Sequence, residues 1–305
     1  MSRNSTPVPQ HPYAPIIASA MRKPELWRVG VMILGGIVIA TILTPLFLAV
    51  IGVIAPNLLP FQNGPRGVMV GATPGGMFTI LSSFAVLAFG TIFLAKRLHN
   101  RGLRDLTGPA ALMRAQFLVT LKWIAGFTVL TFFLPWDGGA EPVTNLSSAT
   151  WLFWLPFALL GLMVQVTAEE LFFRGYMQSQ IAAATGSYPL GIAASAVFFG
   201  LAHMNGSYEG MAAVFPVIWA MGFGLLAGDL TMRSGTIGPA VALHFINNLP
   251  PHLPPRLPRT PPQRLALLSS PTCPRLTTWP TTQLVGGRSS FARPATSPRK
   301  AAARW

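Results

Sequence analysis

The stretch WLFWLPFALLGLMVQVTAEELFFRGY occupies residues 151–176 and joins a membrane-spanning pattern to a charged end. Residues 151–166 carry no charge, and Glu169, Glu170 and Arg174 then follow within six residues. Ionisable side chains in hydrocarbon are costly, so they usually face a protein interior and mark a functional site. We therefore expect these three residues to meet other polar groups inside a helix bundle.

The composition of the whole chain predicts the same class of protein. Of its 305 residues 51% are hydrophobic and 10% are charged, whereas soluble domains average about 25% charged residues. The mean hydropathy is +0.50. We predict an all-α, polytopic transmembrane helix bundle with about seven spans. The expected spans are 26–55, 76–95, 115–136, 151–166, 188–203, 211–230 and a shorter one at 235–248.

Lys and Arg placement predicts the orientation of the bundle. Basic residues gather in two places, the N-terminal lead (Arg3, Arg22, Lys23, Arg28) and the loop after the second span (Lys96, Arg97, Arg101, Arg104, Arg114). The loop after the first span has only Arg66. We therefore expect a cytoplasmic N-terminus. The single cysteine, Cys273, excludes an intramolecular disulfide.

Three regions follow from the composition along the chain. Residues 1–25 are polar and predict a flexible cytoplasmic lead, and residues 26–248 predict one membrane protease domain. Residues 249–305 contain 12 prolines and no Asp or Glu, which predicts a disordered basic tail. Two explanations stay open: a genuine tail that contacts anionic lipid, or a frameshift product. Because the excess charge lies in this tail, no nucleic-acid partner is expected.

Glu169 and Glu170 are expected to lie on different faces of one helix. Glu170 and Arg174 are four residues apart and share a helix face, whereas Glu169 points about 100° away. A simple stabilising ion pair explains Glu170 and Arg174 but leaves Glu169 unexplained. Glu169 is therefore the candidate for chemistry, and Glu170 with Arg174 is expected to support it.

His203 is the first candidate partner for Glu169. If the helix continues to a turn near Thr185, Glu169 lies 16 residues before that turn and His203 lies 18 residues after it. At about 1.5 Å per residue both then lie at a similar depth in an antiparallel hairpin. A carboxylate beside an imidazole can deprotonate water. A lone histidine on an apolar helix is, however, more often a structural hydrogen-bonding residue.

His244 and Asn248 are the second candidate pair. They are four residues apart on the last short apolar segment, so they share a face and can donate hydrogen bonds to an oxyanion. Two chemistries stay open at this point. Either Glu169, His203 and His244 bind a divalent metal such as zinc, or no metal is required and Glu169 with His203 activates water directly. No His-Glu-x-x-His motif is present to decide between them.

Three short motifs in order resemble a known family. Glu-Glu-x-x-x-Arg at 169–174, Phe-x-x-x-His at 199–203 and His-x-x-x-Asn at 244–248 are similar to those of the CPBP (Abi) family. These are intramembrane CAAX prenyl proteases and bacteriocin-processing proteins, and they include the Ras-converting enzyme. The resemblance covers about residues 75–248. The chain departs from it after Asn248, where Pro250 and Pro251 replace another hydrophobic helix.

The resemblance implies an eight-helix fold and endopeptidase activity. It implies that Glu169 activates water with help from His203, and that His244 and Asn248 stabilise the oxyanion. It also implies a protein or peptide substrate near the bilayer, and we expect an integral protein of the bacterial inner membrane. The alternative is a catalytically inactive membrane scaffold or a bacteriocin-immunity-type protein.

Overall fold

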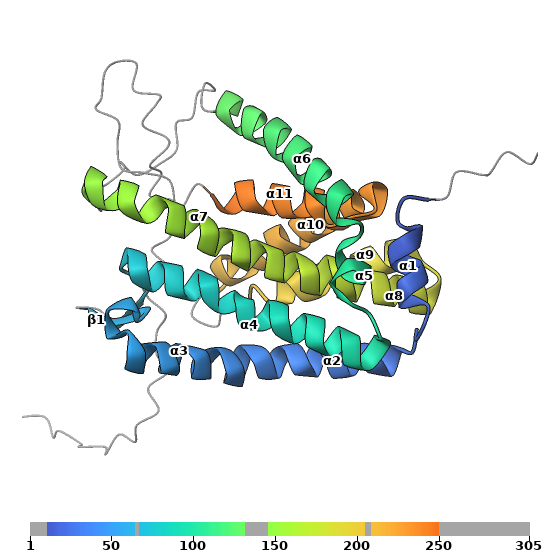
Figure 1. Cartoon of the computed structure of the whole chain (residues 1–305), viewed down its shortest axis with the longest axis horizontal. Helices are drawn as coiled ribbons and strands as arrows, with labels where there is room; N and C mark the ends of the chain where they lie inside the picture. The colour runs from blue at the N-terminus through green and yellow to red at the C-terminus, as the bar shows by residue number, and fades with distance from the viewer. Residues whose placement is uncertain (1–10, 65–66, 132–145, 205–208, 250–305) are drawn as a thin grey trace, which may run out of the picture.

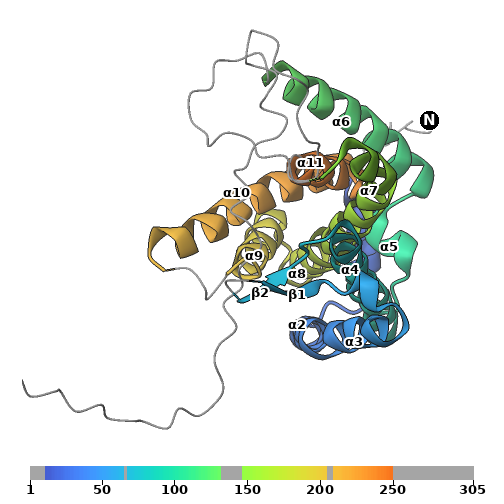
Figure 2. The same ribbon diagram turned by 90° about the vertical axis from the view of Figure 1, so that its left-hand side faces the viewer.

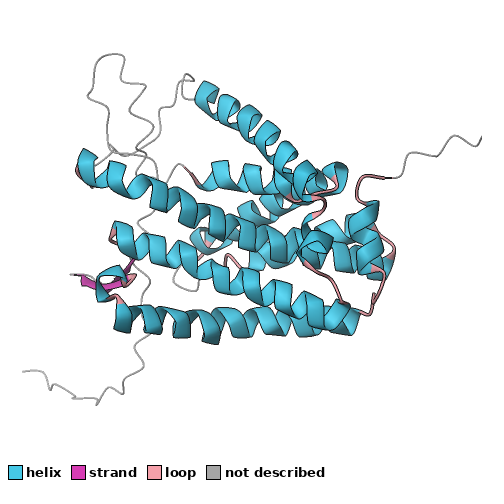
Figure 3. Cartoon of the chain, viewed as in Figure 1, coloured by secondary structure: helices cyan, strands magenta, loops and turns pink. Residues whose placement is uncertain are grey.

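The computed structural model describes residues 11–64, 67–131, 146–204 and 209–249. These residues are almost entirely helical, which confirms the all-α prediction (Figure 3). The helices are α1 (Ala14–Ala20), α2 (Leu26–Val38), η1 (Ile39–Leu43), α3 (Thr44–Ile54), η2 (Pro56–Leu58), α4 (Pro74–His99), α5 (Leu103–Thr107), α6 (Ala110–Thr131), α7 (Ser148–Glu170), η3 (Leu171–Gln178), α8 (Ser179–Thr185), α9 (Tyr188–Leu201), α10 (Met211–Ser234) and α11 (Gly238–Asn248).

The long helices form a bundle in which α4 and α7 lie between two outer layers (Figures 1 and 2). The helices α2 and α3 cover one side, and α6 lies on the opposite side. Within the described residues, four helical segments have the length and composition to cross a membrane. They are Leu26–Ile54, Pro74–His99, Ser148–Thr185 and Met211–Ser234. A helix lies at each of the seven predicted positions, but the number of true spans stays a prediction.

Local sequence signals set the helix ends. At α4, the Thr73 hydroxyl accepts a hydrogen bond from the Gly76 amide, and Pro74 occupies the first turn. The same helix ends at Asn100, whose φ of 56° is the left-handed conformation common at helix C-termini. Ser147 and Ser187 cap α7 and α9 in the same way as Thr73.

A short hairpin joins α3 to α4 and was not anticipated from the sequence. Strands β1 (Phe61–Gly64) and β2 (Gly67–Val70) pair antiparallel, with Phe61 opposite Val70. This hairpin is the whole of the sheet structure in the described residues.

The helix that carries the carboxylates changes its geometry directly after them. The chain is α-helical up to Glu170, π-helical over η3 and α-helical again in α8. It then turns at Gly186, whose φ is +69°, and α9 begins at Tyr188. The expected turn around Thr185 is therefore confirmed. The π-helix was not predicted, and π-helical turns frequently occur at functional sites.

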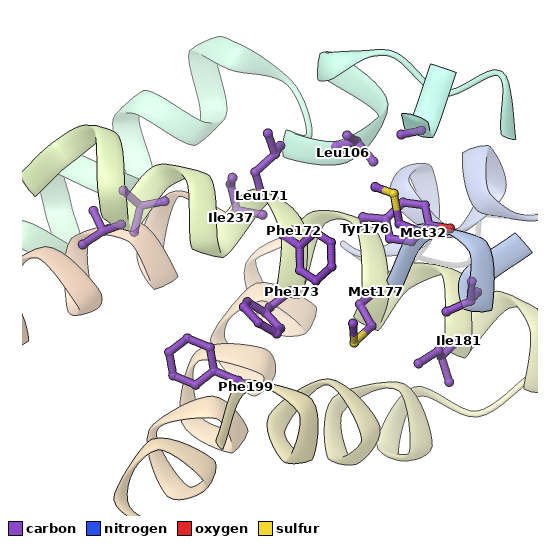
Figure 4. Close-up of a cluster of buried hydrophobic side chains, with 14 of the residues drawn as sticks. Met32, Leu106, Leu171, Phe172, Phe173, Tyr176, Met177, Ile181, Phe199 and Ile237 are labelled. Carbon is purple, nitrogen blue, oxygen red and sulfur yellow. The ribbon is translucent and has the colours of Figure 1, made fainter. Parts of the chain in front are cut away.

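The hydrophobic core is centred on η3. All eight residues of this π-helix are buried. Figure 4 shows its side chains packed against buried residues from other parts of the chain. The labelled members of this cluster are Met32, Leu106, Leu171, Phe172, Phe173, Tyr176, Met177, Ile181, Phe199 and Ile237. Because η3 lies in the close-packed core, Glu169 and Glu170 directly before it are buried as well.

The structure differs from the expected flexible lead over residues 1–25. Residues 1–10 lie outside the described residues, but Ala14–Ala20 form the helix α1, which packs against α5 and α8. Tyr13, Ile16 and Ala20 are buried in this contact. The N-terminal segment packs onto α5 and α8 because it has apolar side chains at helical spacing. The average composition of residues 1–25 is polar and does not indicate this pattern. The predicted tail, 249–305, lies outside the described residues beyond Leu249.

Candidate functional site

The end of α7, the start of η3 and the middle of α11 bring four polar residues together in the interior. The exposed fractions of the side chains are small: Glu169 8%, Glu170 0%, Arg174 1% and His244 3%. Buried ionisable groups of this kind are expected to be paired and hydrogen-bonded. The contacts below show which of them are paired.

Glu170 is the centre of the cluster. Its Oε1 accepts a hydrogen bond from Arg174 Nη1 at 3.1 Å and another from His244 Nδ1 at 2.7 Å. The predicted i,i+4 ion pair is therefore confirmed, and it is buried. The contact with His244 was not predicted. Since an ionised carboxylate only accepts, Nδ1 of His244 carries the proton in this contact.

One of the two carboxylate oxygens of Glu169 is hydrogen-bonded. Its Oε1 accepts a hydrogen bond from Gln165 Nε2 at 3.2 Å, one helical turn earlier. Its Oε2 accepts none from the described residues and lies 3.7 Å from His244 Nε2. This separation is too long for a direct hydrogen bond. A carboxylate oxygen and an imidazole nitrogen at this distance can both contact one small polar molecule.

Arg174 is compensated by its ion pair with Glu170 and by aromatic rings. Its guanidinium lies 4.3 Å from the ring centre of Phe199, 5.7 Å from that of Phe223 and 5.9 Å from that of Phe173. Its Nε and Nη2 have no hydrogen-bond partner among the described residues. Desolvated cation–π contacts can each supply about 2 kcal/mol. The rings thus stabilise the charge together with Glu170, its one ion-pair partner among the described residues.

His203 lies apart from Glu169 in its contacts. The residue follows the end of α9 and is exposed, and its Nδ1 donates to the backbone oxygen of Phe199 at 2.8 Å. Both residues are described, and no hydrogen bond or ion pair joins His203 to Glu169. The ring of Phe199 lies 4.6 Å from that of His203 and 5.7 Å from that of His244. The two histidines therefore flank one aromatic ring.

Asn248 ends α11, four residues after His244, and is half-buried. Its Oδ1 accepts a hydrogen bond from Asn247 Nδ2 at 3.0 Å. This contact orients the carboxamide and leaves the Nδ2 group of Asn248 available as a donor. Asn247 itself is exposed.

The ligands of the metal-dependent alternative do not form a cluster. Across the part of the chain that the structure describes, no three His, Cys, Asp or Glu side chains are arranged to hold a metal ion. Both ring nitrogens of His244 face carboxylates, and Nδ1 of His203 is bonded to its own helix. The set of Glu169, His203 and His244 therefore does not fit a metal in this arrangement.

The comparison with protein families bears on this part of the chain. Residues 150–250 match a family model described as type II CAAX prenyl endopeptidase, Rce1-like. Over these residues the chain is similar to that family, and we refer to them as the Rce1-like domain. This match confirms the resemblance to the CAAX protease family that the three motifs indicated. No curated protein and no solved structure matches the chain.

The Rce1-like domain contains all the polar residues described above, and its helices α7 to α11 position them. Together with the four apolar helical segments, the domain indicates an integral membrane protein. The sequence analysis did not select Phe173 or Phe223. Helical spacing could place Gln165 beside Glu169, but no sequence signal distinguishes these rings from ordinary core aromatics.

Proposed function

We propose that this chain is an intramembrane endopeptidase in which Glu169 is the general base. The observation that supports this most directly is the free Oε2 of Glu169, buried beside His244 within an Rce1-like domain. A base needs an acceptor atom that other groups do not occupy. Glu170 also has a buried Oε2 without a partner among the described residues, but its Oε1 accepts from both Arg174 and His244, so we assign it the role of holding them.

The proposed reaction is hydrolysis of a peptide bond. Glu169 removes a proton from water, and the water oxygen attacks the scissile carbonyl carbon. The carbon–nitrogen bond then breaks, and the proton passes to the leaving nitrogen. His203, at the exposed edge of the site, assists Glu169 when substrate is bound. No metal is required in this scheme.

Two donors are proposed for the oxyanion. Nδ2 of Asn248 is available, as described above. Nε2 of His244 faces the same carboxylate that activates the water. For His244 to donate from Nε2 while Nδ1 donates to Glu170, both ring nitrogens must carry protons. The oxyanion contact is strongest in the transition state, where it lowers the barrier.

The proposed substrates are membrane-associated proteins or peptides that are cleaved near the bilayer surface. Prenylated peptides ending in a CAAX sequence are the first class to test, since the matching family is named for them. The proposed location is the bacterial inner membrane with a cytoplasmic N-terminus. The distribution of Lys and Arg supports that orientation.

The test uses the purified protein in liposomes with a farnesylated CAAX peptide and the same peptide without the lipid. Mass spectrometry identifies the cleaved bond. We expect Glu169→Gln and Glu169→Ala to reduce cleavage by about 10²–10⁴-fold, the usual contribution of a general base. Asp229→Asn is the matched control, because Asp229 is an exposed carboxylate of the same domain paired with Arg233.

Cleavage by Glu169→Gln at the rate of the unaltered protein would refute the assignment of the base. Loss of cleavage after chelation, restored by zinc, would instead favour the metal-dependent version with Glu169, His203 and His244 as ligands. The unprenylated peptide decides whether the lipid is needed.

A non-enzymatic membrane scaffold or immunity-type protein is the second candidate. The observation that favours it is the complete burial of the Glu170–Arg174 pair, which is compatible with a purely structural role. This candidate predicts that Glu169→Gln retains function in cells, whereas substitutions on apolar helix faces abolish it.

A further inference from the structure

Two chains of hydrogen bonds connect the N-terminal segment to consecutive residues of the π-helix η3. They reach Gly175 and Tyr176, which directly follow Arg174. Arg174, which pairs with Glu170, therefore directly precedes the two residues that this second polar network contacts. No part of the proposed catalytic scheme uses this network.

Arg101 is the centre of the first chain. Its side chain is fully buried, and its guanidinium donates four hydrogen bonds. The acceptors are Ser19 Oγ at 3.1 Å, Gln180 Oε1 at 3.0 Å, the Asp105 backbone oxygen at 3.0 Å and the Gly175 backbone oxygen at 3.4 Å. Burial lowers the pKa of Arg101 to about 10, and no carboxylate in the described residues forms a salt bridge with it. A buried cation whose hydrogen-bond acceptors are neutral is costly. Arg101 is therefore stable in the interior when all four acceptors are in position.

His99 forms the second chain. Its Nδ1 lies 2.8 Å from the Lys23 backbone oxygen, and its Nε2 lies 2.7 Å from the Tyr176 hydroxyl. A carbonyl can only accept, so Nδ1 donates to Lys23 and, in the neutral ring, Nε2 accepts from Tyr176. His99 is fully buried as well.

Gln180 closes the network from the α8 side. Its Nε2 donates to the backbone oxygens of Ala20 at 3.1 Å and Lys23 at 2.8 Å, while its Oε1 accepts from Arg101. The end of α1 and the residues after it are thereby bound to the helix that continues η3. Partners from four separate segments must be in place together for all these donors and acceptors to be satisfied.

The packing at Gly175 shows how closely this network fits the π-helix. A Cβ at this position would lie 2.9 Å from the Leu106 backbone oxygen, so α5 rests directly on the backbone of η3. The Gly175 backbone oxygen also accepts from Ser179 Oγ at 2.6 Å. Side-chain donors of this kind can compensate a helix whose hydrogen-bond spacing has widened.

We propose that Arg101 and His99 are positioning residues that couple the docked N-terminal helix α1 to η3, and that this coupling holds Arg174 against Glu170. Their contacts with η3 are made next to Arg174, and their contacts with the N-terminal segment are made at Ser19 and Lys23. The N-terminal segment is thus a structural component of the site, although it lies outside the Rce1-like domain.

The first test does not depend on catalysis. Hydrogen–deuterium exchange of the full chain in nanodiscs reports the opening of residues 171–178, with α10 as the internal reference. Arg101→Met removes the donors, and Arg104→Gln is the matched control because Arg104 is exposed in the adjacent helix α5. We expect exchange in residues 171–178 to accelerate about tenfold or more in Arg101→Met, with α10 unchanged. Exchange equal to that of Arg104→Gln would overturn the proposal.

Milder variants keep the test decisive if Arg101→Met does not fold. Ser19→Ala removes the acceptor of Arg101 Nε and the donor to the Ile16 and Asp105 backbone oxygens but leaves the guanidinium in place. His99→Gln replaces the link to Tyr176. We expect both to accelerate exchange in residues 171–178 selectively, by less than Arg101→Met does. Uniform acceleration over all helices, or none, would refute a role confined to η3.

A second readout concerns cleavage and rests on the proposed function. There Ser19→Ala is expected to lower kcat with KM little changed, because it displaces the Glu170–Arg174 pair without altering substrate contacts. A change in KM alone would refute the positioning role. Absence of cleavage in every variant, including the unaltered chain, would refute the protease proposal while leaving the exchange result to decide this one.

Discussion

His244 Nδ1 lies 2.7 Å from Glu170 Oε1, and this contact joins α11 to the end of α7 across 74 residues of sequence. The same carboxylate oxygen accepts from Arg174. One oxygen of Glu170 therefore holds both a helix-internal cation and the histidine of another helix. Substitution of Glu170 should consequently test the stability of the site, and substitution of Glu169 should test its chemistry.

Glu170→Gln is expected to destabilise the protein strongly. Removal of one member of a buried ion pair typically costs about 3–5 kcal/mol, because the other charge is left uncompensated. Here that charge is Arg174, which is 1% exposed and has no other ion pair in the described residues. Unfolding in detergent by SDS titration measures the change. Glu169→Gln is the comparison and should cost clearly less, because within the described residues the Glu169 side chain is hydrogen-bonded to Gln165 alone.

The double variant Glu170→Gln with Arg174→Met tests the origin of that cost. If the cost arises from an unpaired buried charge, the double variant should be more stable than the sum of the two single losses predicts. The favourable coupling should reach about 1 kcal/mol or more, the range seen for residues in contact. Additive losses would show that packing, rather than charge, accounts for the destabilisation.

Substitution of the two histidines is expected to affect the stability of the protein differently, although both are proposed to be required for cleavage. His203 is exposed, and its ring bonds to the backbone oxygen of Phe199 and lies against the Phe199 ring. His203→Ala should therefore change the free energy of unfolding by no more than about 0.5 kcal/mol. His244→Ala should cost about 1–3 kcal/mol, since it leaves Glu170 with one donor fewer in the interior. Both substitutions should reduce peptide cleavage. A stable and fully active His203→Ala would remove His203 from the proposed mechanism.

The close contact between α9 and α10 offers a matched pair of glycines. A Cβ at Gly224 would lie 2.9 Å from the Ala196 Cα and 3.0 Å from its Cβ, whereas a Cβ at Gly222 would meet nothing within 4 Å. Gly224→Ala is therefore expected to lower the free energy of unfolding by about 1–3 kcal/mol through overpacking. Gly222→Ala, in the same helix, should be neutral or stabilising by up to about 1 kcal/mol. Thermal melting followed by circular dichroism compares them.

The opposite order of the two melting temperatures would contradict the helix packing described for α9 and α10. Because both substitutions add one methyl group to one helix, differences in helix propensity cancel. The comparison therefore reports the distance between the helices alone.

Periodicity and charge alone determined much of this fold. Seven apolar segments predicted helices, and each position holds one. The turn at Gly186 and the Glu170–Arg174 pair also followed from local spacing, because both depend on residues within a few positions of each other. The three motifs that resemble the CAAX protease family needed only their order along the chain, and the family match over residues 150–250 agrees with them.

Only the tertiary structure decided which histidine faces the carboxylates. The predicted hairpin gives the position of His203 along the helix axis but not the direction in which its side chain points. In addition, α9 ends at Leu201, two residues before His203. The π-helix after Glu170 and the placement of α11 bring His244 into the cluster instead. The docking of α1 likewise required folding, since Ser19 and Arg101 are 82 residues apart. Local spacing cannot encode such contacts, because their geometry depends on how separate helices pack.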